Sequence, residues 1–219
     1  MRLPMIWFDF GGVLSPPLED IYTAFETKTG ITPAQLKAAI KGVADELDLP
    51  TMAPVETGLL TEREWGSRLR RVLAEQNPGI DLQRAELETF GRQWFDGVVA
   101  NPEMVRALRT LRDSGFRVGI LSNNVKEWGP YWKAIIAPAG DVDCLIDSCE
   151  VGCRKPDPQI FETAAKSAGV DAKDCVLIDD VQENCAAAQR AGWGSVHFRD
   201  DTQVLRELRD LTGLSALTR

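Results

Sequence analysis

Three short apolar runs in this chain each end directly on polar residues, and this repeated arrangement constrains the fold more than any other feature. The runs cover residues 5–8, 118–121 and 175–178. A continuous apolar run of this length is typical of a parallel strand that is covered on both faces. Helical patterns lie before the second run and on both sides of the third, so strands and helices alternate. This order predicts an α/β fold built on a doubly wound parallel sheet.

The polar residues that end the runs are expected to meet at one edge of this sheet. Helices over residues 102–114, 158–168 and 183–191 lie beside the later strands, and a fourth strand follows over residues 195–198. In sheets of this type, ligands bind beyond the carboxyl ends of the strands. The polar residues that follow the three runs are Asp9, then Ser122 with Asn123 and Asn124, then Asp179 with Asp180.

A different pattern covers residues 18–97, between the first and second predicted strands. Apolar residues recur there with helical spacing, and Thr61 with Glu64 resembles a capping box at the start of a helix. No apolar run of the strand type occurs in this stretch. We therefore expect two domains, an α/β core formed by residues 1–17 and 98–219, and a helical domain formed by residues 18–97.

Composition and charge limit the classes of function. The 219 residues carry a formal net charge of −8, which disfavours nucleic-acid binding, because that binding needs a basic surface. Five cysteines are an odd number in a chain too long for a disulfide scaffold, so a reducing compartment is expected. Asp9 interrupts the first apolar run, which does not fit a signal peptide, and no apolar segment has the length of a membrane span. We expect a cytoplasmic protein without nucleic-acid or membrane partners, and its oligomeric state stays open.

The acidic residues at the predicted edge favour a bound cation. Asp9, Asp179 and Asp180 would crowd three carboxylates together, which raises their pKa values unless a positive charge neutralises them. Mg²⁺ is a hard cation that prefers oxygen ligands. Alternatively, Asp179 or Asp180 would only cap the helix that follows. Because Asp9 comes from a second strand, we favour the metal site.

Two further features lie beside this edge. Lys155 stands before a helix in the Pro-bounded turn of residues 154–158, which restricts a side chain that is normally exposed. Gly11 and Gly12 follow Asp9, which indicates a tight turn or a close approach of the backbone to another group.

Taken in order, these residues form four motifs that resemble those of the haloacid dehalogenase superfamily of hydrolases. The motifs cover residues 8–14, 121–123, 154–161 and 178–180, the last accompanied by Asn184. The helical domain is predicted at the place where this superfamily carries its C1 cap. Within the superfamily, the chain looks most like small phosphatases related to the N-terminal domain of soluble epoxide hydrolases.

The resemblance implies phosphoryl transfer from a small phosphorylated metabolite, such as a sugar phosphate, through an aspartyl-phosphate intermediate. Asp9 would attack phosphorus, Ser122 would donate a hydrogen bond to a phosphoryl oxygen, and Lys155 would balance the negative charge. This chemistry consists mostly of positioning and charge neutralisation.

The resemblance also implies how the cofactor and the substrate are held. Mg²⁺ would bind Asp9, the backbone carbonyl of Gly11 and Asp180, with Asp179 in support. The residues implied to surround the substrate are Gly11, Gly12, Asn123 and Asn124.

The sequence departs from the family pattern at Gly11. Most phosphatases of the family carry a second Asp there, which protonates the leaving alcohol and later activates water. Three explanations stay open. The leaving group could need little protonation, as in a sugar anomeric phosphate or an acyl phosphate. A water or a cap residue such as Glu19 or Asp20 could replace the acid, or the protein could have lost catalysis and only bind a phosphorylated ligand.

Other chemistries fit the residues less well. Dehalogenases of the family also lack the second Asp, but they typically have Tyr there, use no Mg²⁺ and lack the paired acids that Asp179 and Asp180 provide. His197, the only histidine, lies within the predicted fourth strand, which disfavours a Ser-His-Asp triad. Trp128 is the aromatic residue most expected in a pocket, because it follows Ser122 closely in the sequence.

Overall fold

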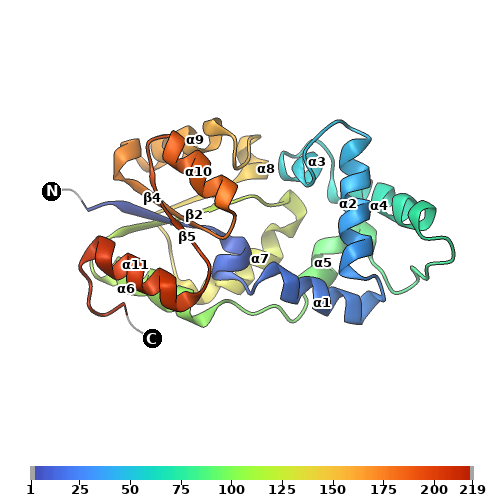
Figure 1. Cartoon of the computed structure of the whole chain (residues 1–219), viewed down its shortest axis with the longest axis horizontal. Coiled ribbons are helices and arrows are strands. Elements are labelled where there is room, and N and C mark those ends of the chain that lie inside the picture. The colour runs from blue at the N-terminus through green and yellow to red at the C-terminus, as the bar shows by residue number, and fades with distance from the viewer. Residues whose placement is uncertain (1–2, 218–219) are drawn as a thin grey trace.

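A computed structural model describes residues 3–217, which form a sheet of five parallel strands in the order β3-β2-β1-β4-β5. The strands are β1 (Met5–Phe8), β2 (Arg117–Ser122), β3 (Cys144–Asp147), β4 (Cys175–Asp179) and β5 (Gly194–His197). Phe8 pairs with Ile120 of β2 and with Ile178 of β4, so the carboxyl ends of these three strands are level. The sheet confirms the predicted α/β fold and brings the segments after β1, β2 and β4 to one edge (Figure 1).

Helices cover both faces of the sheet, because side chains of each strand alternate between two apolar layers. Ile6 and Phe8 of β1 pack in one layer with residues of α6, α7 and α11, whereas Met5 and Trp7 pack in the other with residues of α9 and α10. Figure 1 shows α9 and α10 on one side of the strands, and α6 and α11 on the other. These helices are α6 (Pro102–Asp113), α7 (Gly129–Ile136), α9 (Pro158–Ala168), α10 (Gln182–Arg190) and α11 (Asp201–Thr212).

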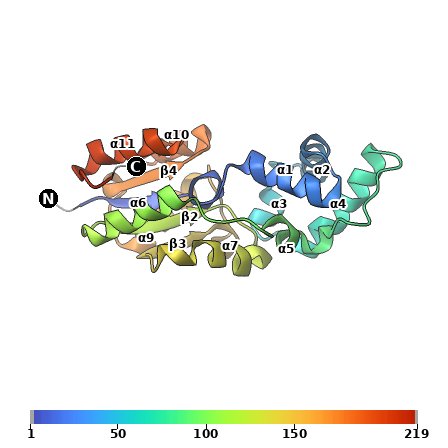
Figure 2. The same cartoon turned by 90° about the horizontal axis from the view of Figure 1, so that it is seen from below.

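Residues 18–97, here called the helical segment, extend from the strand-end edge of the α/β part (Figure 2). The predicted capping box starts α4, where Thr61 Oγ1 accepts from the amide of Glu64 and the Glu64 carboxylate accepts from the amide of Thr61. The helices of the segment are α1 (Leu18–Thr29), α2 (Pro33–Asp45), α3 (Ala53–Glu56), α4 (Glu62–Gln76) and α5 (Phe90–Trp94).

The structure adds a strand that the sequence analysis did not predict. β3 lies at the edge of the sheet, and only its last two residues, Ile146 and Asp147, are buried. An edge strand with so little apolar burial gives a weak sequence pattern. Three helices of the α/β part were also not predicted, namely α7, α11 and the short helix α8 (Ser148–Val151), which follows β3. Each predicted strand or helix agrees with the observed one within one residue at each end.

Two predictions reach beyond these observations. The predicted core includes residues 1–2 and 218–219, which lie outside the described residues. The division into two domains stays a prediction.

Across the part of the chain that is described, no helix has both the length and the apolar character that crossing a membrane requires.

Candidate active site

Asp9 is the first side chain beyond β1, and backbone bonds fix it at the edge of the sheet. Its amide donates to the carbonyl of Ile178 at 2.9 Å, which extends the pairing with β4. Its Oδ1 accepts a hydrogen bond from the amide of Phe10 at 2.7 Å. Its Oδ2 has no hydrogen-bond partner within residues 3–217, although the side chain is mostly buried. One carboxylate oxygen is therefore anchored and the other is available to a ligand.

Lys155 is buried between two carboxylates. Its Nζ lies 2.9 Å from Asp9 Oδ1 and 2.5 Å from Asp179 Oδ2, and its side chain is only 1% exposed. Asn123 holds the backbone of Lys155, since its amide group donates to the Lys155 carbonyl and accepts from the Lys155 amide, both at 2.8 Å. Lys155 thus connects the segments that follow β1, β2 and β4.

The charges in this cluster are strongly coupled. Burial alone would lower the pKa of Lys155, but Asp179 and Asp9 outweigh burial and raise that pKa. Burial also raises the pKa of Asp9, and Asp179 and Asp180 raise it further against the opposing effect of Lys155. Burial together with Asp179 raises the pKa of Asp180 to about 6. The three carboxyl groups have one buried ammonium group among them, so the cluster is short of positive charge.

The carboxyl groups fit a hard divalent cation. Oxygens of Asp9, Asp179 and Asp180 all lie within 4.8 Å of one another. Asp179 is the most constrained, because its Oδ2 accepts from Lys155 and its Oδ1 accepts from the amide of Val181 at 2.9 Å and from Asn184 Nδ2 at 3.0 Å. An all-oxygen donor set with excess negative charge is what Mg²⁺ prefers.

Gly12 makes room for the Asp180 carboxylate. Its φ is +71°, which favours glycine, and a Cβ there would lie 2.3 Å from Asp180 Oδ2. Gly11 has a φ of −66°, and a Cβ there would meet only Leu18 Cδ2 at 3.8 Å. The close approach that the two glycines predicted is therefore confirmed at Gly12 and is not required at Gly11.

We expect Gly12→Ala to lower the free energy of unfolding by about 1–3 kcal/mol, because a non-glycine residue is strained at this φ. The Asp180 carboxylate must also move to make room for the added Cβ. Gly11→Ala is the matched control and should cost much less. Urea denaturation of the two variants measures both losses. Equal losses would contradict the close packing of Gly12 against Asp180.

The other predicted residues take different positions. Asn123 and Asn124 line the cavity described below, whereas Ser122 does not; it is 1% exposed, and its Oγ reaches the carbonyl of Asn123 at 3.5 Å. The amide of Asn124 donates to Ser148 Oγ at 3.0 Å. His197 lies in β5, and its Nε2 is 3.1 Å from the carbonyl oxygen of Asp180. No hydrogen bond joins Ser122 to His197 among the described residues, and such a bond is what a triad requires.

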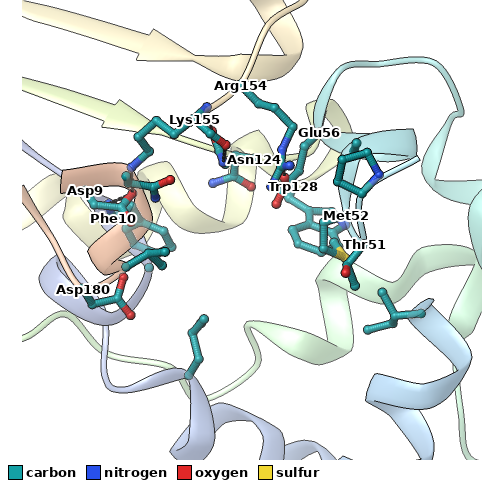
Figure 3. A pocket seen from close by; sticks show the side chains of 18 of the residues that line it. Asp9, Phe10, Thr51, Met52, Glu56, Asn124, Trp128, Arg154, Lys155 and Asp180 are labelled. Carbon is teal, nitrogen blue, oxygen red and sulfur yellow. Dashed lines mark hydrogen bonds and ion pairs between the residues drawn. The ribbon is translucent and has the colours of Figure 1, made fainter. Parts of the chain in front are cut away.

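A cavity of about 670 Å³ lies between the acidic cluster and the helical segment. Figure 3 shows Asp9 and Asp180 on one side of the cavity, and Thr51, Glu56 and Trp128 on the other. Trp128 therefore lines the pocket as predicted. Much of the remaining wall is aromatic and comes from the helical segment, namely Tyr22, Trp65, Phe90, Trp94 and Phe95.

Glu56 and Arg154 are cavity residues that no sequence pattern predicted. Arg154 Nε donates to Glu56 Oε2 at 2.7 Å, and both side chains line the cavity. The two residues are 98 positions apart, and no periodic pattern links them. The only available signal was the position of Arg154 directly before Lys155.

Comparisons with known proteins agree with this geometry. The sequence matches the haloacid dehalogenase-like hydrolase family over residues 5–192. It is 30% identical to bifunctional epoxide hydrolase 2 of Sus scrofa over 99% of this chain and 40% of that protein. It is 29% identical to flavin mononucleotide hydrolase 1 of Arabidopsis thaliana over 71% of this chain and 60% of that protein. The chain thus spans about two fifths of the length of the pig protein.

Solved structures share the fold. A family enzyme of Bacteroides thetaiotaomicron, in complex with magnesium and inorganic phosphate, has a TM-score of 0.61 and 20% identity, covering 90% of this chain and 94% of that one. An L-2-haloacid dehalogenase of Xanthobacter autotrophicus has a TM-score of 0.64 and 16% identity, covering 100% and 85%. From the family match and the shared fold, we conclude that this chain belongs to the haloacid dehalogenase-like hydrolases, and that phosphatases are among its relatives.

Proposed function

We propose that the protein is a Mg²⁺-dependent phosphatase that hydrolyses a small phosphorylated metabolite through an aspartyl phosphate on Asp9. The observation that carries this proposal is the buried Lys155, which contacts both Asp9 and Asp179 at the wall of the cavity. A lysine held in this way can neutralise a phosphoryl group beside a carboxylate nucleophile. The helical segment would act as the cap that covers the substrate.

The cofactor fits the donor set of the cluster. Mg²⁺ would be held by Asp9, the carbonyl of Gly11 and Asp180, with Asp179 behind them, and would neutralise charge on the phosphoryl oxygens. The protein residues also have defined tasks. Oδ2 of Asp9 forms a bond to phosphorus while the bond from phosphorus to the leaving oxygen breaks and its electron pair stays on that oxygen. Water then attacks the phosphorus of the aspartyl phosphate while the bond from phosphorus to Oδ2 breaks and its electron pair returns to Oδ2. The products are phosphate, which keeps a proton of the water or passes it to solvent, and the restored Asp9 carboxylate.

The missing acid at Gly11 limits the leaving groups. Of the two residues that we considered as replacements, Glu19 pairs with Lys37 at 2.6 Å on the exposed surface, and Asp20 is exposed. Neither lines the cavity. Their positions therefore disfavour Glu19 and Asp20 as replacements for the acid.

Release of phosphate from p-nitrophenyl phosphate tests the proposed function, because its leaving group needs no acid. We expect turnover that requires Mg²⁺, stops in chelator and falls by at least about 10²-fold in Asp180→Asn. Asp210→Asn, an exposed carboxylate on α11, is the control. Vanadate binding without any turnover would instead indicate a phospho-ligand binding protein, and metal-independent halide release from a haloacid would indicate a dehalogenase.

A substitution at Gly11 tests whether the missing acid limits the rate. The open space around Gly11 can accept a side chain. We expect Gly11→Asp to raise kcat/KM for an alkyl phosphate such as glycerol 2-phosphate by at least about tenfold, and for p-nitrophenyl phosphate much less, because acid catalysis helps poor leaving groups most. Gly11→Asn separates the acid from the added volume. Equal effects on both esters would mean that protonation is not limiting.

A further inference from the structure

Glu56 and Arg154 form an ion pair that joins the helical segment to the α/β part inside the cavity. Arg154 Nε lies 2.7 Å from Glu56 Oε2, and the side chains are 18% and 12% exposed. The Glu56 carbonyl also accepts from Ser148 Oγ at 2.6 Å. Two bonds from the α/β part therefore fix Glu56, at the carboxyl end of α3.

The position of Arg154 is tied to the acidic cluster. Arg154 directly precedes Lys155, whose backbone is held on both sides by the Asn123 side chain. In Figure 3 the Lys155 side chain extends toward Asp9, and the Arg154 side chain extends toward Glu56. The two adjacent cations thus lie at opposite ends of one cavity. Lys155 contacts Asp9 at one end, and Arg154 contacts Glu56 at the other.

The ion pair has unused hydrogen-bonding capacity. Nε is the only guanidinium nitrogen of Arg154 with a partner among residues 3–217, which leaves Nη1 and Nη2 as donors. Oε1 of Glu56 likewise accepts no hydrogen bond within the described chain. Burial raises the pKa of Glu56, and Arg154 opposes that effect. The ion pair as a whole carries no net charge, and it still offers the Nη groups of Arg154 as donors and Oε1 of Glu56 as an acceptor.

We propose that the Glu56–Arg154 pair is the specificity-determining contact for the body of the substrate, and that it recognises hydroxyl groups on a neutral body. This inference rests on the proposed phosphatase function, which places the phosphoryl group at Asp9. A hydroxyl both donates and accepts, so it can bond to Oε1 of Glu56 and to the Nη groups of Arg154 together. A second anionic group would meet the Glu56 carboxylate, and a purely apolar body would leave the buried donors unpaired.

Three probes with the same phosphomethyl group test this recognition by titration calorimetry in Mg²⁺ with Asp9→Asn, whose turnover is expected to be too slow to disturb the titration. Glucose 6-phosphate carries ring hydroxyls, and cyclohexylmethyl phosphate has a six-membered ring without them. The third probe, 6-phosphogluconate, is the open-chain oxidised form of glucose 6-phosphate, which keeps hydroxyl groups and carries a carboxylate at C1. We expect glucose 6-phosphate to bind at least about tenfold more tightly than either of the others, since hydrogen bonds to charged groups at a buried site discriminate by this much or more.

Two variants in the same background assign the preference to the pair. Arg154→Lys keeps the charge but removes the planar donors, and it should reduce the preference over cyclohexylmethyl phosphate to about threefold or less. Glu56→Gln removes the neutralising charge and should shift the preference toward 6-phosphogluconate. Arg70→Lys is the matched control, because Arg70 pairs with Glu88 in the helical segment away from the cavity. Thermal midpoints of all variants report folding.

Turnover of p-nitrophenyl phosphate by the wild type distinguishes this inference from the proposed function. If the wild type turns over that ester but Asp9→Asn binds the three probes equally, or does not bind glucose 6-phosphate, the recognition role is refuted and the phosphatase function stands. The recognition role would also be refuted if Arg154→Lys kept the wild-type preference for glucose 6-phosphate over cyclohexylmethyl phosphate and Glu56→Gln kept its preference over 6-phosphogluconate. No turnover and no binding would refute both.

Discussion

Asp9→Asn is expected to reduce the turnover of p-nitrophenyl phosphate by about 10⁴-fold or more, because it removes the nucleophile of the proposed reaction. The substitution is nearly isosteric. An asparagine oxygen can still accept from the amide of Phe10 and from Lys155, which hold Asp9 Oδ1 in the wild type at 2.7 Å and 2.9 Å. A loss of this size with an unchanged fold would therefore report chemistry rather than collapse of the site. The measurement is kcat under saturating Mg²⁺.

Asp20→Asn is the control for this experiment. Asp20 is an exposed carboxylate of α1 that does not line the cavity, so its substitution should change kcat by less than about twofold. If Asp9→Asn kept a tenth or more of the wild-type rate, Asp9 would not be the nucleophile, and the proposed mechanism would be wrong.

Lys155→Met is expected to damage both stability and activity. Methionine fills a similar volume, but it leaves Asp9 and Asp179 buried without their positive partner. Breaking a buried ion pair in this way costs about 3–5 kcal/mol. In a chain of this size such a loss lowers the thermal midpoint by roughly 6–20 °C. Calorimetry measures the midpoint, and the remaining activity is measured well below it.

Lys166→Met gives the matched control, because Lys166 is an exposed lysine near the end of α9. It should leave the midpoint within about 2 °C of the wild type, as surface substitutions usually do. If Lys155→Met behaved like Lys166→Met in both measurements, Lys155 would not hold the acidic cluster together. Charge neutralisation by Lys155 would then not be what stabilises the site.

The central strands of the α/β part could be predicted because the signal for each of them lies in a few neighbouring residues. Each of the strands β1, β2 and β4 is a continuous apolar run with a polar residue at its end, so its burial and its direction toward the site could be inferred together. Parallel pairing then places these ends at one edge, as the structure shows for Asp9 and Asp179. β3 was missed because an edge strand with two buried residues lacks this pattern.

The far side of the cavity could not be predicted in the same way. Its walls depend on how α1 to α5 pack, and their helical periodicity shows which residues are buried but not which residues meet. The contact of Glu56 with Arg154 and that of Trp128 with Glu62 each join positions that are distant in the sequence, 98 and 66 residues apart. Helical periodicity carries no information on pairs of this kind, so the substrate end of the site required the structure.

The most direct test of the proposed function is to look for the phosphoryl group on Asp9. The wild type is mixed with p-nitrophenyl phosphate and Mg²⁺, quenched in acid during turnover, and digested for mass spectrometry. We predict one added phosphoryl group on the peptide that contains Asp9, and none when Asp9→Asn is treated in the same way. Steady turnover with no phosphorylated peptide, or with the phosphoryl group on another residue, would contradict a covalent mechanism at Asp9.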